Sequence, residues 1–305
     1  MNNSTLRMSR SPYTPSRALR RLDIVTTQHH SEVISLRVLG EVEAIGPHGT
    51  FAPGRSRPGA LLALLTLNAG RMMSADRLLE EVWPNESEPG NPKRLHVNIM
   101  RLRQGLGRTA PHSDVAALIR TRACGYALEI ERDRVDAFRF ERLMQRGRTA
   151  LELGDPQQAA RDLRAALSLW RGDPYAGYAY EPFVSLEVSR LEELRLSALE
   201  DWAQAELEVG GHARIASELE QIVRRHPLRE RLRALLMLAL YRCRRQGDAL
   251  AAYRAGRRAL IDELGIEPGA ELRDLEWAIL AQSPSLEWSG ATRTMPATVS
   301  LSIAC

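Results

Sequence analysis

The sequence has few of the residues that would mark an exported, membrane or disulfide-stabilised protein. Its three cysteines lie far apart, so they form no C-x-x-C motif, and an odd number cannot complete a disulfide framework. No apolar run approaches the roughly 20 residues that crossing a bilayer requires, and no secretion signal opens the chain. We therefore expect a protein of the reducing cytoplasm with no membrane partner.

Sequence motifs of catalysis are also missing. There is no Gly-rich phosphate loop, no G-x-S-x-G, no H-E-x-x-H and no Cys/His cluster, and the seven histidines are scattered. We therefore expect no enzyme and no bound metal or cofactor.

The charge is unevenly divided along the chain. Residues 1–134 contain 19 Arg or Lys against 13 Asp or Glu, a net charge of +6, whereas residues 135–305 contain 23 against 25, a net charge of −2. A basic excess in the first part suits contact with nucleic acid. Ordinary surface charge would explain the excess equally well. The placement of the basic residues therefore has to distinguish between these two explanations.

The first part of the chain has the elements of a winged helix-turn-helix domain. Apolar and polar residues alternate in short runs that predict strands over 34–39, 42–45, 118–121 and 126–130, with another strand near Phe51. The runs over 118–121 and 126–130 are predicted to form a β-hairpin. The apolar period and the capping residues predict helices over 60–70, from Ser74 to Trp83 and from Asn91 to Gly107. A small sheet, three helices and a hairpin make up this fold.

The rest of the chain is expected to be helical. Breaks at Gly154, Gly210 and Gly247 join pairs of helices, which is typical of tetratricopeptide-like domains, although the spacing is irregular against the usual ~34 residues. The predicted fold class is mainly α with a small β component. The predicted divisions are a disordered tail over 1–32, a DNA-binding domain over 33–132, a helical domain over 133–283 and a second disordered tail over 284–305.

The helix predicted from Asn91 to Gly107 has two different faces. At 100° per residue its inward stripe consists of Leu95, Ile99, Leu102 and Leu106. The opposite face places cations in the first turn, where they oppose the helix dipole, and leaves two apolar side chains exposed. Contact with DNA explains both features better than a solvated face does. The candidate DNA-binding residues on this face and its flank are Lys93, Arg94, Val97, Met100, Arg101, Arg103 and Gln104.

The hairpin offers a second contact. Arg120 and Arg122 lie near its tip, where arginine can enter a narrow minor groove of raised negative potential.

Several runs of residues resemble the Streptomyces antibiotic regulatory proteins. ISLRVLGEVEA, GALLALLTLNAGRMMSADRLLEEVW, LHVNIMRLRQGLG and IRTRACGYAL are similar to the winged helix of that family. VDAFRFERL, ALSLWRGDPYAGY, RLEELRLSALED and the run from HPLRERL to EPGAEL are similar to its bacterial transcriptional activation domain. The resemblance covers roughly residues 33–283.

The resemblance implies a cluster-specific activator of antibiotic genes. It would bind direct repeats upstream of promoters, associate head to tail on DNA and engage RNA polymerase holoenzyme. It places Val97 and Arg101 at base contacts and Lys93, Arg94 and Arg103 at phosphate contacts. The sequence departs from the family at Gly59, where a basic residue is common, and at Asn98, where an aromatic residue or His is common and which we include among the DNA-binding candidates.

Two alternatives are left at this point. A helical scaffold that binds only proteins would need no basic stripe opposite a core stripe, and a gel shift would separate it from an activator. An enzyme is disfavoured by the missing motifs.

If the chain is an activator, a division at residue 132 further predicts that the fragment 33–132 binds DNA by itself.

Overall fold

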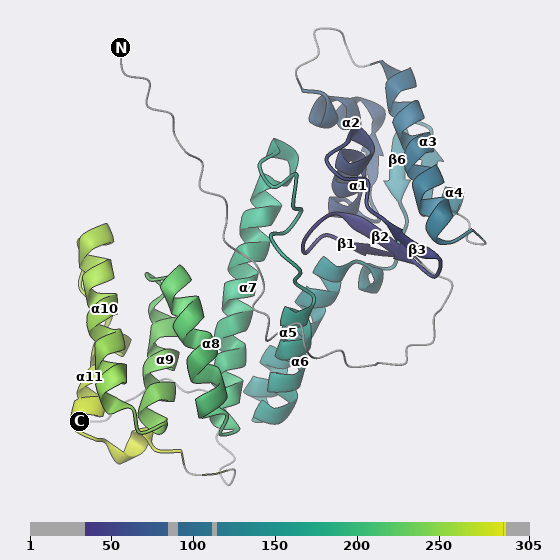
Figure 1. Ribbon diagram of the computed structural model, residues 1–305. Coiled ribbons are helices and arrows are strands. Elements are labelled where there is room, and N and C mark those ends of the chain that lie inside the picture. The colour runs from purple at the N-terminus through teal and green to yellow at the C-terminus, as the bar shows by residue number, and fades with distance from the viewer. Residues whose placement is uncertain (1–33, 85–90, 112–114, 289, 291–305) are drawn as a thin grey trace, which may run out of the picture. The chain divides into compact units, whose positions relative to one another are not determined.

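The computed structural model describes residues 34–84, 91–111, 115–288 and 290 (Figure 1). The chain forms two compact units, one of residues up to Phe140 together with Ser168–Glu193, the other of Glu141–Leu167 and the chain from Leu194 onward. The tail predicted over 1–32 lies outside the described residues. Within the described ranges, no helix is both long and apolar enough to span a membrane.

The first unit opens with an antiparallel three-stranded sheet in the order β1-β2-β3. The strands are β1 (Ser35–Arg37), β2 (Glu43–Gly46) and β3 (Gly49–Phe51). β1 is shorter than the predicted run over 34–39, because the backbone of Val38 and Leu39 bonds to residues from later in the chain instead of to β2. The sheet contacts α3 through β2 and β3.

Capping residues explain where the first three helices of this unit begin. In α1 (Arg57–Leu67) the Ser56 side chain accepts a hydrogen bond from Gly59 N, and in α2 (Ala75–Val82) that of Ser74 accepts one from Arg77 N. In α3 (Pro92–Thr109) the Asn91 side chain accepts one from Lys93 N. The predicted starts of α2 and α3 are confirmed, whereas α1 begins three residues before the prediction and α3 ends two residues after it.

A second antiparallel sheet, in the order β4-β6-β5, joins the wing to the helices. The hairpin of β5 (Ile119–Arg122) and β6 (Gly125–Leu128) was predicted, and it is present. β4 (Met72–Ser74), between α1 and α2, was not predicted, and residues before the hairpin form a short helix, α4 (Val115–Leu118), where a strand was expected to begin.

Residues 168–193 complete the first unit. The backbone N–H groups of Arg171 and Tyr175 donate to the carbonyl oxygens of Leu39 and Val38, at 2.8 and 2.7 Å. The side chain of Tyr178 donates to the carbonyl oxygen of Gly54. The first unit is therefore built from two stretches of chain, the second of which is Ser168–Glu193.

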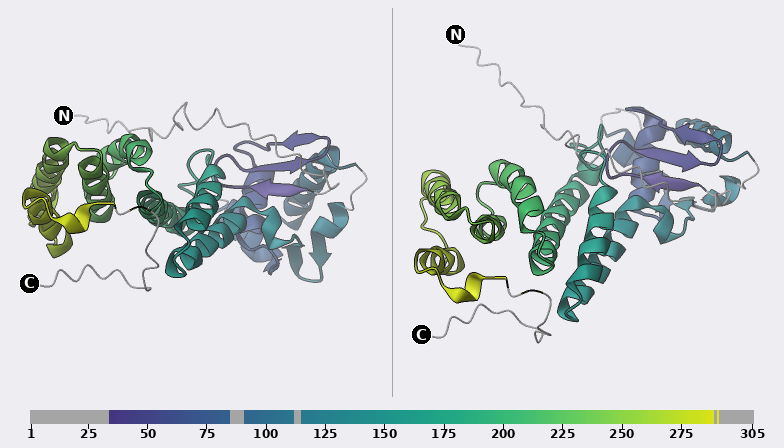
Figure 2. Two further views of the ribbon diagram at one scale, coloured as in Figure 1. Left: turned by 90° about the horizontal axis from the view of Figure 1, so that it is seen from below. Right: turned by 60° about the horizontal axis from the view of Figure 1, so that its bottom comes forward.

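The second unit is helical, as predicted. It contains parts of α5 (Asp136–Glu152), α6 (Pro156–Ser168) and α7 (Pro182–Glu208), followed by α8 (His212–Arg225), α9 (Glu230–Arg242), α10 (Gln246–Leu264) and α11 (Ala270–Leu280). Figure 2 shows α8, α9 and α10 as successive neighbours, and α9 also contacts α11. This is the helix-pair packing of a tetratricopeptide-like domain.

The prediction of a tail over 284–305 is wrong for its first residues. Pro284–Leu286 form a 3₁₀ turn, and the Leu286 side chain is buried. Arg242 Nε donates to the Leu286 carbonyl oxygen at 2.9 Å, and the Trp288 indole donates to the Glu208 carbonyl oxygen at 3.1 Å. No periodic pattern in the sequence indicates that these residues would bond to preceding helices. Residues 289 and 291–305 lie outside the described residues.

Candidate nucleic-acid interface

The inward stripe of α3 is buried as predicted. Leu95 is 1% exposed, and Ile99, Leu102 and Leu106 are fully buried. The stripe faces α1 and α2, both of which contact α3. Burial fixes the rotation of the helix about its axis, and with it the residues that the opposite face presents.

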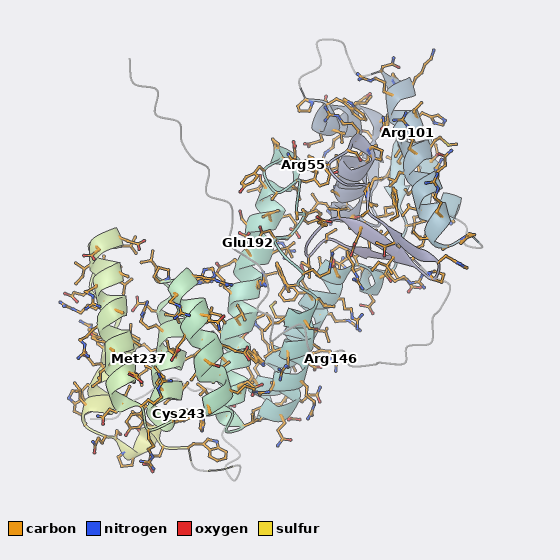
Figure 3. The ribbon with its side chains drawn as sticks, viewed as in Figure 1. Arg55, Arg101, Arg146, Glu192, Met237 and Cys243 are labelled. Atoms are coloured by element: carbon orange, nitrogen blue, oxygen red, sulfur yellow. The ribbon has the colours of Figure 1, made fainter. Side chains whose placement is uncertain are left out.

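The outer face of α3 carries most of the predicted DNA-binding residues. Val97 is 47% exposed and Met100 is 42% exposed, although both are large and apolar. Arg101 lies in the middle of the helix (Figure 3), between them and Gln104. Lys93, Arg94, Arg101 and Gln104 are all exposed. Cationic and apolar side chains thus share one solvent-facing surface, which can meet phosphates, base edges and thymine methyl groups.

Two of the predicted residues are engaged inside the domain. Arg103 donates to the Ile119 carbonyl oxygen at 2.5 Å and to the Thr121 hydroxyl at 2.9 Å, so it ties α3 to the first strand of the wing. The Asn98 side chain donates to the Arg94 carbonyl oxygen one turn earlier in the helix, at 2.8 Å. A positioning role for Arg103 therefore fits the structure better than a phosphate contact does.

The wing arginines share one carboxylate. Arg120 Nε lies 2.9 Å from one Glu129 oxygen, and an Arg122 terminal nitrogen lies 2.5 Å from the other. Both arginine side chains are about half exposed. Sequence reasoning missed Glu129, because nothing local to residue 129 indicates that it would reach back across the hairpin.

The departure at Gly59 has a structural reason. A Cβ atom at this position would overlap the Tyr178 hydroxyl and the Gly54 carbonyl oxygen. The Tyr178 hydroxyl accepts a hydrogen bond from Ser56 N at 3.0 Å. A basic side chain at residue 59 would have to displace this contact, so the phosphate contact that such a residue could make is not available here.

Gly125 should be essential to the wing. It pairs with Ser74, and an added Cβ atom would overlap the Met73 carbonyl oxygen, which is backbone and cannot move aside. We expect Gly125→Ala to separate β4 from β6 and to lower the free energy of unfolding by about 1–3 kcal/mol, as overpacking does. Chemical denaturation of the full chain measures this, with Gly172→Ala as the control because a Cβ atom there meets nothing within 4 Å. Equal loss in both variants would contradict the expected overlap.

The two parts of the chain match two families. Residues 54–128 match the family described as "Transcriptional regulatory protein, C terminal", and residues 135–280 match the "Bacterial transcriptional activator domain". The winged helix, followed along the chain by an activation domain, defines a DNA-binding transcription activator.

Proteins that are similar to this chain over most of its length show to which family of activators it belongs. The regulatory protein DnrI of Streptomyces peucetius is 33% identical over 89% of this chain and 100% of its own length. The transcriptional regulator RedD of Streptomyces coelicolor is 38% identical over 83% of this chain and 72% of its own. This chain belongs to the Streptomyces antibiotic regulatory protein family.

A solved structure has the same fold. It is Mycobacterium tuberculosis EmbR in complex with a low-affinity phosphopeptide, at a TM-score of 0.76 and 32% identity. The match covers 82% of this chain and 66% of that one.

Proposed function

We propose that this activator switches on a secondary-metabolite gene cluster by binding direct repeats in promoter DNA and engaging RNA polymerase holoenzyme. The outer face of α3 reads the bases, the wing contacts the adjacent minor groove, and the helical domain makes the protein contacts. Copies of the chain associate head to tail on successive repeats. The role of the protein is regulatory rather than catalytic, and the protein is located in the cytoplasm, where it binds the chromosome.

One observation carries the DNA-binding part of this proposal. Exposed Lys93 and Arg101 lie on the same helix face as exposed Val97 and Met100, opposite a stripe that is fully buried. A helix that only covered a core would not need apolar side chains among its outward cations, whereas a helix in the major groove uses both kinds. Direct repeats suit a chain that meets its neighbour head to tail, because a two-fold dimer would require inverted repeats.

The proposal is tested by footprinting and transcription with the full chain. We expect protection of adjacent repeats upstream of a cluster promoter, and transcription from that promoter by RNA polymerase holoenzyme only when the chain is added. Protection without added transcription would reject the activation step. No protection of any cluster promoter would favour the helical scaffold instead.

Binding should weaken steeply as the salt concentration rises. Lys93 is exposed in the first turn of α3 and should contact a phosphate, so Lys93→Ala should reduce the slope of log affinity against log salt by about 0.9. It should also weaken binding to all sequences alike. Fluorescence anisotropy over a salt series measures both effects. Arg258→Ala, an exposed charge on α10, is the control, and an equal change of slope in the two variants would contradict the contact.

A further inference from the structure

Glu129 lies on the same face of the wing as Arg120 and Arg122. Its backbone N–H donates to the Leu118 carbonyl oxygen at 2.8 Å, which extends the β5–β6 pairing by one step beyond the hairpin. Because side chains alternate along a strand, every second residue from 118 to 122 shares a face with every second residue from 125 to 129. On this face of its strand only Gly125 and Ala127 stand between Glu129 and the tip, so both arginine side chains can lie back along the hairpin to reach it.

The Glu129 carboxylate engages both wing arginines, which are the groups that a DNA phosphate would need. Each Glu129 oxygen holds one arginine, at 2.9 Å for Arg120 and 2.5 Å for Arg122. A phosphate group, like a carboxylate, offers arginine a pair of anionic oxygen acceptors. A DNA strand that engages the wing arginines therefore has to displace Glu129 from them.

We propose that Glu129 is an internal competitor for the DNA backbone. It holds the wing arginines when no DNA is bound, and the wing engages a duplex only by exchanging this carboxylate for phosphate. The exchange opposes binding to every sequence, but on an operator the base contacts of α3 add favourable free energy that a random duplex lacks. Glu129 thus limits occupancy of non-specific DNA. The inference rests on the proposed DNA interface and adds a residue that acts against binding.

The competition should show in the salt dependence as well as in affinity. A Glu129 carboxylate released beside DNA attracts a cation and so offsets part of the cation release that drives binding. Glu129→Gln keeps the shape of the side chain but removes the charge, so this offset disappears. The pairs are half exposed and individually weak, so the variant should fold as the wild type does.

The test compares Glu129→Gln with Glu131→Gln in the full chain, using a duplex of random sequence and fluorescence anisotropy over a series of salt concentrations. Glu131 is 72% exposed and pairs with Arg134, so its substitution changes the net charge equally without freeing a wing arginine. We expect Glu129→Gln to bind about three- to tenfold more tightly than Glu131→Gln, with a slope steeper by about one. Equal affinity of the two variants, or weaker binding by Glu129→Gln, would overturn the proposal.

A second comparison separates competition from a general charge effect. With Arg120→Gln and Arg122→Gln already present, adding Glu129→Gln should change the affinity no more than adding Glu131→Gln does. A gain that persists without the arginines would overturn the competition. A wild-type chain that binds no duplex even at low salt would reject the proposed function itself, and is thereby distinguished from failure of this inference alone.

Discussion

A fragment ending at residue 132 should fail to fold stably, although it holds the strands and helices of the winged helix. In the structure the first unit also contains Asp136 and the stretch Ser168–Glu193. This replaces the expectation that 33–132 is sufficient for DNA binding. We expect the fragment to show no cooperative thermal transition and no specific DNA binding, whereas the full chain shows both.

The reason lies at Val38 and Leu39, which are fully buried. Their N–H groups donate to the two oxygens of the Asp136 carboxylate, at 2.8 and 3.1 Å. Their carbonyl oxygens accept from Tyr175 and Arg171. Truncation at residue 132 leaves four backbone groups without these partners, and each unsatisfied buried group costs roughly 1–3 kcal/mol. The sum is comparable to the whole stability of a domain, about 5–15 kcal/mol.

A point substitution tests the same account within the full chain. Burial raises the pKa of the Asp136 carboxyl, while the hydrogen bonds from Val38 and Leu39 and the charge of Arg171 act to lower it. Asp136→Ala removes both acceptors and should lower the free energy of unfolding by about 3–5 kcal/mol. Asp136→Asn keeps one acceptor and should lose less. Exposed Asp133→Asn is the control and should change it by less than about 0.5 kcal/mol.

A fragment 33–132 that melts cooperatively would contradict this reading of the first unit. An Asp136→Ala chain with the same free energy of unfolding as the Asp133→Asn chain would contradict it as well. Urea denaturation followed by circular dichroism measures the point variants.

Arg101→Ala should weaken sequence-specific binding strongly while leaving the fold intact. The side chain points away from the buried stripe of α3, so the free energy of unfolding should change by less than about 0.5 kcal/mol. Loss of a base contact weakens operator binding by about 1–3 kcal/mol, and it leaves affinity for random duplex much less affected. Val97→Ala should relax the preference at a neighbouring base pair, because Val97 is placed to contact a thymine methyl group.

The measurement is competition between operator and random duplex in a gel shift. Arg258→Ala removes the same charge from α10 and should keep the wild-type ratio of the two affinities. If Arg101→Ala also keeps that ratio, the recognition face has been placed on the wrong side of α3.

Features set by neighbouring residues could be predicted from the sequence. Ser74 and Asn91 cap the helices that follow them, and the stripe from Leu95 to Leu106 is buried, because capping and helical periodicity depend on residues a few positions apart. The exposed face of α3 followed from the same periodicity.

Features set by distant partners could not be predicted. β4 is a strand only because Met73 pairs with Tyr126, more than fifty residues later, and its three residues have no alternation that marks them. Arginine is a residue type that commonly binds phosphate, yet the hydrogen-bond acceptors of Arg103 are groups of the wing. The pairing of Asp136 with Val38 likewise joins segments that no local pattern connects.

Selection of bound sequences from a pool of random duplexes tests the central claim most directly. The full chain should enrich a short element that recurs in direct orientation, spaced by about one helical turn of DNA or a multiple of it. The Arg101→Ala chain, selected in parallel, should still retain DNA at low salt but enrich that element far less. A wild-type pool without any enriched element would contradict the claim that the outer face of α3 reads DNA sequence, as would equal enrichment of the element by both chains.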